Sequence, residues 1–221
     1  MDGIHDMGGT SGWGKAHRPD PAERVFPQEW EGRAFALALL SMRVSGTNLD
    51  AFRHSMERLD RARYVDDTYY GRWLNGAENL LIDSGIIAPG AIDARARHLL
   101  GEEATEPDVP EPHKPDYAPT GPGSLRIVET PPAFATGQLV RAKNISPAGH
   151  TRLAKYVRGH SGVIEHVRPA ALLPDTHAHF LGENAQHVYS VRFDGQELWG
   201  ASSEALTLNI DLFESYLEAA S

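Results

Sequence analysis

Apolar side chains recur at helical spacing through the first half of the chain. Residues 27–44 carry two such stripes, one formed by Trp30, Ala34, Leu37 and Ser41 and the other by Phe35, Leu39 and Met42. A helix that is apolar on so much of its circumference must be covered on more than one side. Pro27 suits the first turn of this helix, and Gly46 ends it.

Three more helices are predicted before residue 101. The second helix has apolar residues at helical spacing, namely Leu49, Phe52, Met56 and Leu59. Either Thr47 or Asn48 can cap it. Residues 67–84 form a third helix, rich in aromatic and leucine side chains, with Gly85 as its C-cap. A short fourth helix follows at about residues 89–100.

The domain boundaries follow from composition. Residues 1–26 are rich in Gly and Pro with isolated large groups such as Trp13, so we expect an extended arm across a surface of this chain or of a partner. The helical domain then spans residues 27–100. Residues 101–135 hold seven acidic residues, two basic ones and eight of the 15 prolines, which is typical of an extended linker. Residues 136–221 form the last domain.

The hydrophobic period changes in this last domain. Alternating or β-branched segments predict four strands, at residues 138–143, 162–168, 187–193 and 206–213. Frequent glycines separate them, which is typical of a small barrel or sandwich. The segment YVRGHSGVIEHV, after GQLVRAK, has the G-x-V-x-x-V form of SH3-like barrels. The expected fold class is therefore α+β, with a helical N-terminal half and a C-terminal SH3-like β barrel.

Composition excludes several classes of partner. The net charge is −9 and the sequence pI is about 5.6, which argues against nucleic acid or an anionic membrane, because both require a basic face. The chain has no cysteine, so it offers neither disulfide nor thiolate ligand, and this fits a reducing cytoplasm. The start MDGIHDMGG lacks the features of a signal peptide. The longest apolar run, residues 34–40, is too short to span a bilayer.

Few motifs suggest chemistry within the chain itself. GGTSGWGK follows no predicted strand and lacks P-loop spacing, so a flexible arm is favoured over a nucleotide site. His177 and His179, with Asp175 or Glu183 nearby, can ligate a metal, but a solvated Pro/Gly loop is the simpler interpretation. No G-x-S-x-G elbow points to a serine nucleophile.

Two arginines and an aromatic group are the remaining candidates. Arg53 lies in NLDAFRHSMERL, near the apolar face of the second helix, and Arg152 lies in the turn PAGHTR. Either can be an ordinary surface or structural arginine. A guanidinium among apolar groups must find anions, because a buried unpaired charge is very costly, and we expect another chain to supply them. Tyr69, Tyr70 and Trp73 can be plain core or line an apolar pocket.

Several segments, in order along the chain, resemble the β subunit of nitrile hydratase. MDGIHDMGGTSGWGK resembles the N-terminus of that family. FPQEWEGRAFAL, NLDAFRHSMERL and YVDDTYYGRW resemble its helical half. SPAGHTRLAKYVRGHSGVIEHV, PDTHAHFLGENAQHVYSVRFDGQELWG and DLFESYLE resemble its barrel half. The resemblance covers nearly the whole chain except the acidic linker.

The resemblance implies a chain that wraps around an α subunit, in αβ units that usually pair into an α2β2 heterotetramer. The metal, low-spin Co(III) or Fe(III), would be held by a cysteine cluster and two backbone amides of the α subunit. Two of those cysteines would be oxidised, to sulfinic and sulfenic forms. This chain would bind no metal itself, in keeping with its lack of cysteine.

Residue by residue, the LDEFR-type motif of the family matches residues 49–53, and its GHxR motif matches residues 149–152. The resemblance implies that Arg53 and Arg152 hold the oxygens of the oxidised cysteines. A guanidinium suits this role because it offers a rigid fork of charged donors to anionic acceptors. Loss of such a partner typically costs about 10–100-fold in activity or metal affinity.

The pocket residues of the family match Leu49, Phe52, Tyr69 and Trp73. Ala38 stands where relatives carry a larger residue, which implies more room for the substrate. Trp73 favours the cobalt type over the iron type, although the partner chain selects the metal. The implied reaction adds water across a nitrile to give an amide, and we expect the Tyr69 hydroxyl to orient substrate or water.

Three alternatives stand beside this interpretation. Thiocyanate hydrolase divides the helical and barrel parts between separate chains, whereas this chain has both. A nitrile hydratase maturation factor would resemble mainly the helical half. An RNA-binding SH3-like module would need a basic stripe, which a net charge of −9 disfavours.

Overall fold

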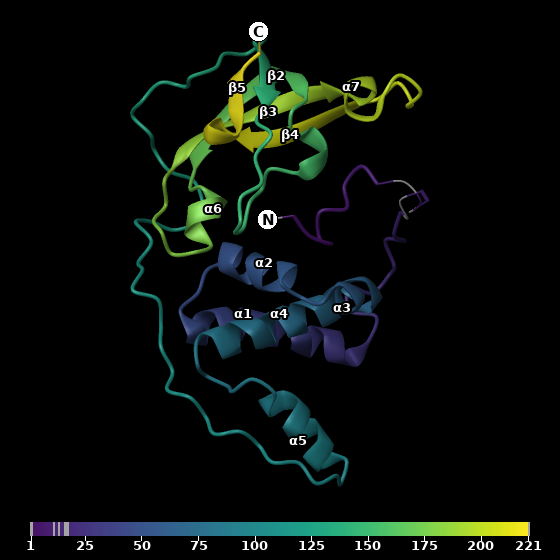
Figure 1. Cartoon of the computed structure of the whole chain (residues 1–221), viewed down its shortest axis with the longest axis vertical. Coiled ribbons are helices and arrows are strands. Elements are labelled where there is room, and N and C mark those ends of the chain that lie inside the picture. Colours follow the sequence, from purple (N-terminus) through teal and green to yellow (C-terminus); the bar gives the residue numbers. More distant parts are fainter. Residues whose placement is uncertain (1, 11, 13, 16–17, 221) are drawn as a thin grey trace. The chain divides into compact units, whose positions relative to one another are not determined.

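The chain folds into two compact units. The computed structural model describes residues 2–10, 12, 14–15 and 18–220, and Trp13, expected as an anchor of the arm, lies outside them. One unit is His17–Asp116, and the other combines Met1–Ala16 with Tyr117–Ser221. The first of these holds the helices α1 to α5, and the second holds all five strands (Figure 1).

Three helices form the centre of the helical unit, namely α1 (Glu29–Ser45), α2 (Leu49–Glu57) and α4 (Tyr69–Asp83). Both α1 and α2 pack along α4. Gly76 permits the close approach of α2, because a Cβ atom there would lie 2.5 Å from Cγ of Met56. Across the same contact, Oγ of Ser55 donates to the Gly76 carbonyl oxygen at 2.9 Å. The buried core between the helices consists of Ala38, Phe52, Ala77 and Leu80.

Local signals explain most helix ends. The Asn48 side chain accepts a hydrogen bond from the Ala51 N–H at 2.9 Å and so caps α2, as predicted. Gly46 ends α1 in the left-handed region, with φ of 69°. The predicted start of α1 is wrong by two residues, because Gln28 is the N-cap and Pro27 precedes the helix. The sequence did not predict the short helix α3 (Arg61–Asp66), which has no buried residue. Helix α5 (Ala91–Leu99) confirms the predicted fourth helix.

The C-terminal unit is built on an antiparallel sheet. Its strands are β1 (Leu139–Ala142), β2 (Ser161–Ala171), β3 (Gln186–Asp194), β4 (Thr207–Phe213) and β5 (Leu217–Ala219). The first four confirm the predicted strands, and β5 is new. The strand order is β4-β3-β2-β1-β5. The α+β class is confirmed. Within the described residues the edge strands β4 and β5 are not paired with each other, so the expected closed barrel is not confirmed.

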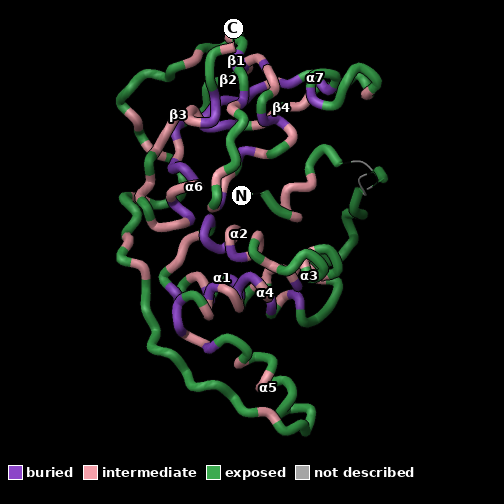
Figure 2. The backbone as a smooth tube through the Cα atoms, viewed as in Figure 1, coloured by how far each residue is buried: buried purple, intermediate pink, exposed green. Residues whose placement is uncertain are grey.

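Short helices and turns complete this unit around a buried core. They are η1 (Lys155–Val157), α6 (Pro174–His177), α7 (Gly195–Trp199) and η2 (Glu214–Tyr216). Buried positions, shown in purple in Figure 2, lie on the strands and also on the short helices and turns between them. Tyr189, Tyr216 and Phe193 are the largest of these side chains, and each is at most 2% exposed. The hydroxyl groups of the two tyrosines therefore need hydrogen-bond partners inside the unit.

The first residues of the chain pack on the C-terminal unit. The carboxylate of Asp2 accepts hydrogen bonds from Oγ of Ser146 at 2.6 Å and from Nη1 of Arg158 at 2.5 Å. These two hydrogen bonds lower the pKa of Asp2. The carboxylate of Asp6 accepts from the backbone N–H of Lys155 at 2.8 Å. This part of the arm thus lies across a surface of its own chain, one of the two expected outcomes.

The acidic segment has contacts at both of its ends. On the helical unit, the N–H of His113 donates to the Ser84 carbonyl oxygen at 2.9 Å, while residues 101–112 run largely exposed (Figure 2). On the C-terminal unit, the Arg126 guanidinium pairs with Glu183 at 2.6 Å, and both side chains are nearly buried. No helix in the described part of the chain combines the length and apolarity that a membrane crossing requires.

Candidate functional site

The helix α2 presents Arg53 at the surface of the helical unit. Its guanidinium is 41% exposed, and Nη1 donates to Oδ1 of Asp50 at 2.9 Å. Because Asp50 lies one turn earlier on the same helix, this ion pair orients the fork without burying it. Among the described residues no other acceptor holds this guanidinium, so most of its donors are available to another molecule. Leu49 lies four residues before Arg53 on the same face and is 47% exposed.

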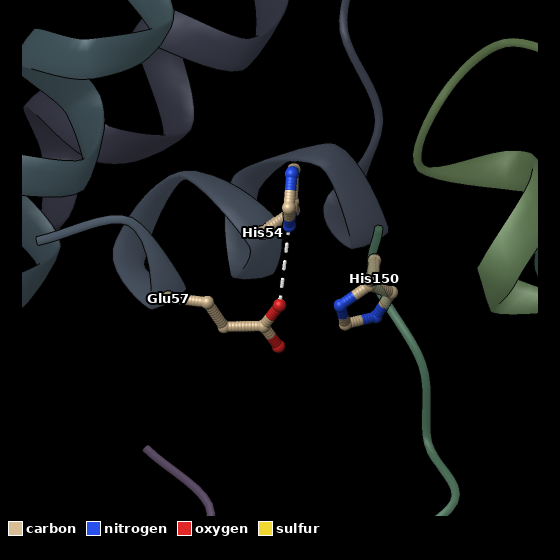
Figure 3. A group of neighbouring side chains, drawn as sticks. All are labelled: His54, Glu57 and His150. Atoms are coloured by element: carbon tan, nitrogen blue, oxygen red, sulfur yellow. Dashed lines mark hydrogen bonds and ion pairs between the residues drawn. The ribbon is translucent and has the colours of Figure 1, made fainter. Parts of the chain in front are cut away.

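A second charged pair lies on α2, and the sequence reasoning missed it. In Figure 3 the imidazole of His54 faces the carboxylate of Glu57, with Nδ1 and Oε2 3.2 Å apart. The i, i+3 spacing alone was the signal that would have found it. The same figure draws His150, which belongs to the C-terminal unit.

The expected pocket residues gather in an aromatic group on α4 and its neighbours. The Trp73 ring lies 5.2 Å from that of Phe52 and 5.7 Å from that of Tyr69, measured between centroids. Phe52 and Ala38 are fully buried in the helical core, whereas Tyr69 is 60% exposed. The group therefore grades from a sealed interior to an exposed phenol, which is the arrangement of an apolar wall with one polar handle.

The turn at residues 149–152 presents the second arginine. The backbone N–H of His150 donates to Nε2 of His179 at 3.0 Å, and the N–H of Arg152 donates to the Tyr216 hydroxyl at 3.2 Å. His150 is fully buried and Arg152 is exposed. The described residues give the Arg152 guanidinium no ion-pair partner. A fixed backbone therefore carries a guanidinium that is open to an external anion.

The side chains considered for a metal site each have a different partner. The Asp175 carboxylate accepts a hydrogen bond from Tyr216. The His177 ring packs edge-on against Tyr117, with 5.5 Å between centroids. His179 accepts from the His150 backbone, and Glu183 pairs with Arg126. These contacts explain the side chains as structural groups, and the structure does not bring them together as one ligand set.

An apolar groove opens elsewhere on the helical unit. Its volume is about 450 Å³, and α1, α3, α4 and α5 line it, mainly with Leu37, Leu40, Val44, Leu74, Leu81 and Ile92. None of the expected pocket residues lines this groove. The exposed leucines and valine of α1 leave this face of the helix without a cover from the described chain.

Known proteins resemble the chain along its whole length. Models of the nitrile hydratase β subunit match residues 1–118 with their N-terminal part and residues 124–219 with their C-terminal part. The chain is 40% identical over 222 residues to a nitrile hydratase subunit beta of Pseudomonas putida, covering 100% of both chains. The chain belongs to the nitrile hydratase β-subunit family. It is also 35% identical to a cobalt-containing nitrile hydratase subunit beta of Pseudonocardia thermophila, covering 99% of this chain and 96% of the relative.

Among solved structures, a recombinant apo-enzyme of thiocyanate hydrolase from Thiobacillus thioparus matches 40% of this chain and 76% of its own. The identity is 31% and the TM-score is 0.38. Within the nitrile hydratase β-subunit family, the two motif arginines of this chain offer donors only. A guanidinium always carries charge and cannot ligate a metal cation, so the functional groups described here suit anionic acceptors.

Proposed function

We propose that this chain is the β subunit of a nitrile hydratase, which hydrates nitriles to amides together with an α subunit. The observation that carries the proposal is the exposed guanidinium of Arg53, oriented by Asp50 on α2, in a chain of this family that has no cysteine. The full-length match to the Pseudomonas putida relative supports it. The presence of both the helical unit and the sheet unit favours this role over a maturation factor.

In this proposal Arg53 and Arg152 each donate to oxygens of oxidised cysteine ligands in the α subunit. Those oxygens are anionic acceptors, and charge-assisted hydrogen bonds from a guanidinium are about twice as strong as neutral ones. The Co(III) or Fe(III) ion of the α subunit supplies Lewis acidity toward the nitrile or water. A relative named as cobalt-containing supports cobalt as the first metal to test.

The aromatic group forms one wall of the substrate pocket. Trp73 supplies apolar surface and is held by the fully buried Phe52 ring packed against it, and the exposed Leu49 adds apolar surface on α2. The exposed Tyr69 hydroxyl orients substrate or water by a hydrogen bond. Ala38 lies in the same buried cluster as Phe52, where a larger side chain would displace the neighbouring aromatic rings.

The α subunit covers apolar surface of the helical unit, including the exposed Leu37, Leu40 and Val44 of α1. Such a patch is costly to leave in water, which supports an obligate αβ unit and, with two of them, an α2β2 assembly. In this proposal the C-terminal five-stranded sheet corresponds to the SH3-like barrel half of the family. The isolated chain should then be inactive, metal-free and poorly soluble.

The decisive test is co-expression with a candidate α subunit, followed by metal analysis and a nitrile hydration assay. We expect a stable complex with one metal per αβ unit and amide as product. Arg53→Lys and Arg152→Lys keep the charge but lose the fork, so turnover should fall about 10–100-fold.

Matched controls exist for both arginines. Arg58→Lys changes a guanidinium at the end of α2 that pairs with Asp83, and Arg168→Lys changes one on β2 whose Nε lies 3.6 Å from Asp211. Both controls should leave turnover unchanged. A metal-loaded complex that hydrates nitriles equally well with lysine at both motif positions would contradict the proposed role of the arginines.

A further inference from the structure

The hydroxyl of Tyr216 lies at the centre of a hydrogen-bond network beneath the Arg152 turn. It accepts from the backbone N–H of Arg152 at 3.2 Å and from Oγ1 of Thr151 at 3.3 Å, and it donates to Oδ1 of Asp175. A phenol has one proton and two acceptor sites, so this set uses its full capacity. Tyr216 itself is 2% exposed, so water does not compete for these bonds.

The hydrogen bonds of this network run in one donor-to-acceptor direction and end at a carboxylate. The Leu153 N–H donates to Oγ1 of Thr151 at 3.2 Å, the Thr151 hydroxyl donates to Tyr216, and Tyr216 donates to the Asp175 carboxylate. A charged acceptor at the end of such a chain polarises every bond in it. Burial, together with the Asp175 charge, raises the pKa of Tyr216, so the phenol keeps its proton at every physiological pH.

Hydrogen bonds from a second buried side chain hold the other side of the same turn. The Arg158 guanidinium donates from Nε and Nη2 to the Leu153 carbonyl oxygen at 3.2 Å and 2.9 Å. The backbone on both sides of the Arg152 Cα atom is thus fixed by buried side chains, while the Arg152 side chain itself stays exposed. The direction in which the Arg152 side chain leaves the backbone is therefore fixed by these buried groups.

We propose that Tyr216 and Asp175 are positioning residues for Arg152. They hold its backbone N–H so that the guanidinium meets the acceptor oxygens of the partner subunit in one orientation. This inference rests on the proposed function of Arg152, but it adds two residues, 23 and 64 positions further along the chain, that touch neither substrate nor metal ligands. It also assigns a use to Asp175, which the sequence offered only as a possible metal ligand.

The test compares Tyr216→Phe with Tyr189→Phe in the assembled αβ enzyme. Tyr189 is an equivalent buried phenol, because its hydroxyl donates to Glu214 at 2.5 Å and accepts from a backbone N–H, that of Phe134, at 3.4 Å. Both substitutions remove one buried hydroxyl from the same sheet unit. Only Tyr216→Phe frees the Arg152 backbone, so only this variant should lower kcat, by about 10-fold, with KM unchanged.

Two readouts separate positioning from general destabilisation. Hydrogen exchange of the Arg152 amide should accelerate about 10-fold relative to that of Val191 in the Tyr216→Phe enzyme, and not in the Tyr189→Phe enzyme. In the double variant Tyr216→Phe with Arg152→Lys, kcat should be close to that of Arg152→Lys alone, because residues acting through one another are not additive. Asp175→Asn keeps an oxygen acceptor, so its kcat should lie between that of the parent enzyme and that of Tyr216→Phe. This variant also tests the inference if the Tyr216→Phe chain fails to assemble with the α subunit.

The possible results are distinguishable. If Arg152→Lys lowers kcat while Tyr216→Phe matches Tyr189→Phe in kcat and in exchange, the positioning inference is overturned and the proposed function stands. If the two effects multiply in the double variant, Tyr216 acts independently of Arg152 and the inference is also overturned. An Arg152→Lys enzyme with full kcat would overturn the proposed role of Arg152, and the catalytic part of this inference with it, while nitrile hydration itself would stand.

Discussion

The imidazole of His179 occupies the space in which a side chain on Gly149 would begin. A Cβ atom at Gly149 would overlap Nε2 of that ring and lie 3.0 Å from Cδ2. The same Nε2 atom accepts the backbone N–H of His150, the next residue, at 3.0 Å. The first position of the GHTR motif is thus a glycine because a histidine ring packs directly on the backbone, where it also serves as acceptor.

Gly149→Ala should therefore displace His179 and loosen the turn that carries Arg152. We expect a loss of about 1–3 kcal/mol in the free energy of unfolding, as for other overpacked sites. Hydration turnover should fall as well, because the turn presents Arg152. Urea unfolding and the nitrile assay measure the two effects. Gly121→Ala is the control, because the nearest atom to its added methyl is 4.0 Å away; a Gly149→Ala enzyme as stable as this control would contradict the packing argument.

The Arg126–Glu183 pair predicts a defined acid sensitivity. Hydrogen bonds from Arg126, and then from Thr120, hold the pKa of Glu183 at about 2, below its ordinary value of 4.5. The ionised form is therefore favoured in the folded state, and its contribution to stability is present above pH 4.5 and lost as the pH falls towards 2. Glu183→Gln should flatten the dependence of unfolding free energy on pH in this window.

Urea unfolding between pH 2 and pH 6 measures that effect. Glu106→Gln is a suitable control, because Glu106 pairs with Arg95 at 3.1 Å in an exposed position where water screens the charges. If the unfolding free energy of Glu183→Gln falls with decreasing pH as steeply as that of the control, the Arg126–Glu183 pair is not coupled to folding.

Tyr69→Phe separates stability from chemistry in the aromatic group. The ring contacts with Tyr70 and Trp73 need no hydroxyl, and the side chain is exposed, so unfolding free energy should change by less than about 0.5 kcal/mol. Turnover of the assembled enzyme should fall by about 10-fold if the hydroxyl orients substrate or water by a hydrogen bond. Tyr64→Phe, beneath the Arg72 guanidinium, is the control. Unchanged turnover in Tyr69→Phe would refute the assigned role.

Ala38→Val tests whether the core beneath the aromatic wall controls substrate size. Ala38 is fully buried with Phe52 and Ala77, so two added methyl groups should cost about 1–3 kcal/mol in unfolding free energy. Displacement of Phe52 should also narrow the pocket, and kcat/KM should fall more for bulky nitriles than for small ones. Ala34→Val, one turn earlier and 2% exposed, should lose stability without this change in preference. Equal selectivity in both variants would contradict the role of Ala38.

Local chemistry accounts for the parts of the fold that the sequence predicted. Asn48 caps α2 and Gly46 ends α1, because these signals act within one turn of the helix. The four longer strands were predicted from their alternation. Helix α3 was missed because it has no buried residue, and strand β5 because it has only three residues. Both are too short to show a periodic pattern of apolar residues.

The sequence predicted some residues of the candidate site and missed others that depend on contacts distant in sequence. Residue matching to a family pointed to Arg53 and Arg152, and short spacing on α2 and α4 brings Phe52, Tyr69 and Trp73 into contact. The partners of the Arg152 turn were not predicted as such. Tyr216 lies 64 residues away in sequence, and its hydroxyl acquires a role only when η2 packs beneath the turn. Such tertiary hydrogen bonds leave no periodic trace in a sequence.

The anchoring of Asp2 on Arg158 has a consequence for biosynthesis. The helical unit is continuous in sequence, so a ribosome delivers all of it before most of the sheet has been made. The sheet unit, in contrast, combines residues that precede the helical unit with residues that follow it, and 156 positions separate Asp2 from its guanidinium partner. The Asp2 carboxylate therefore lacks its guanidinium partner until residue 158 has been synthesised, and the turn that carries Arg152 lacks the Tyr216 hydroxyl until residue 216 has been added.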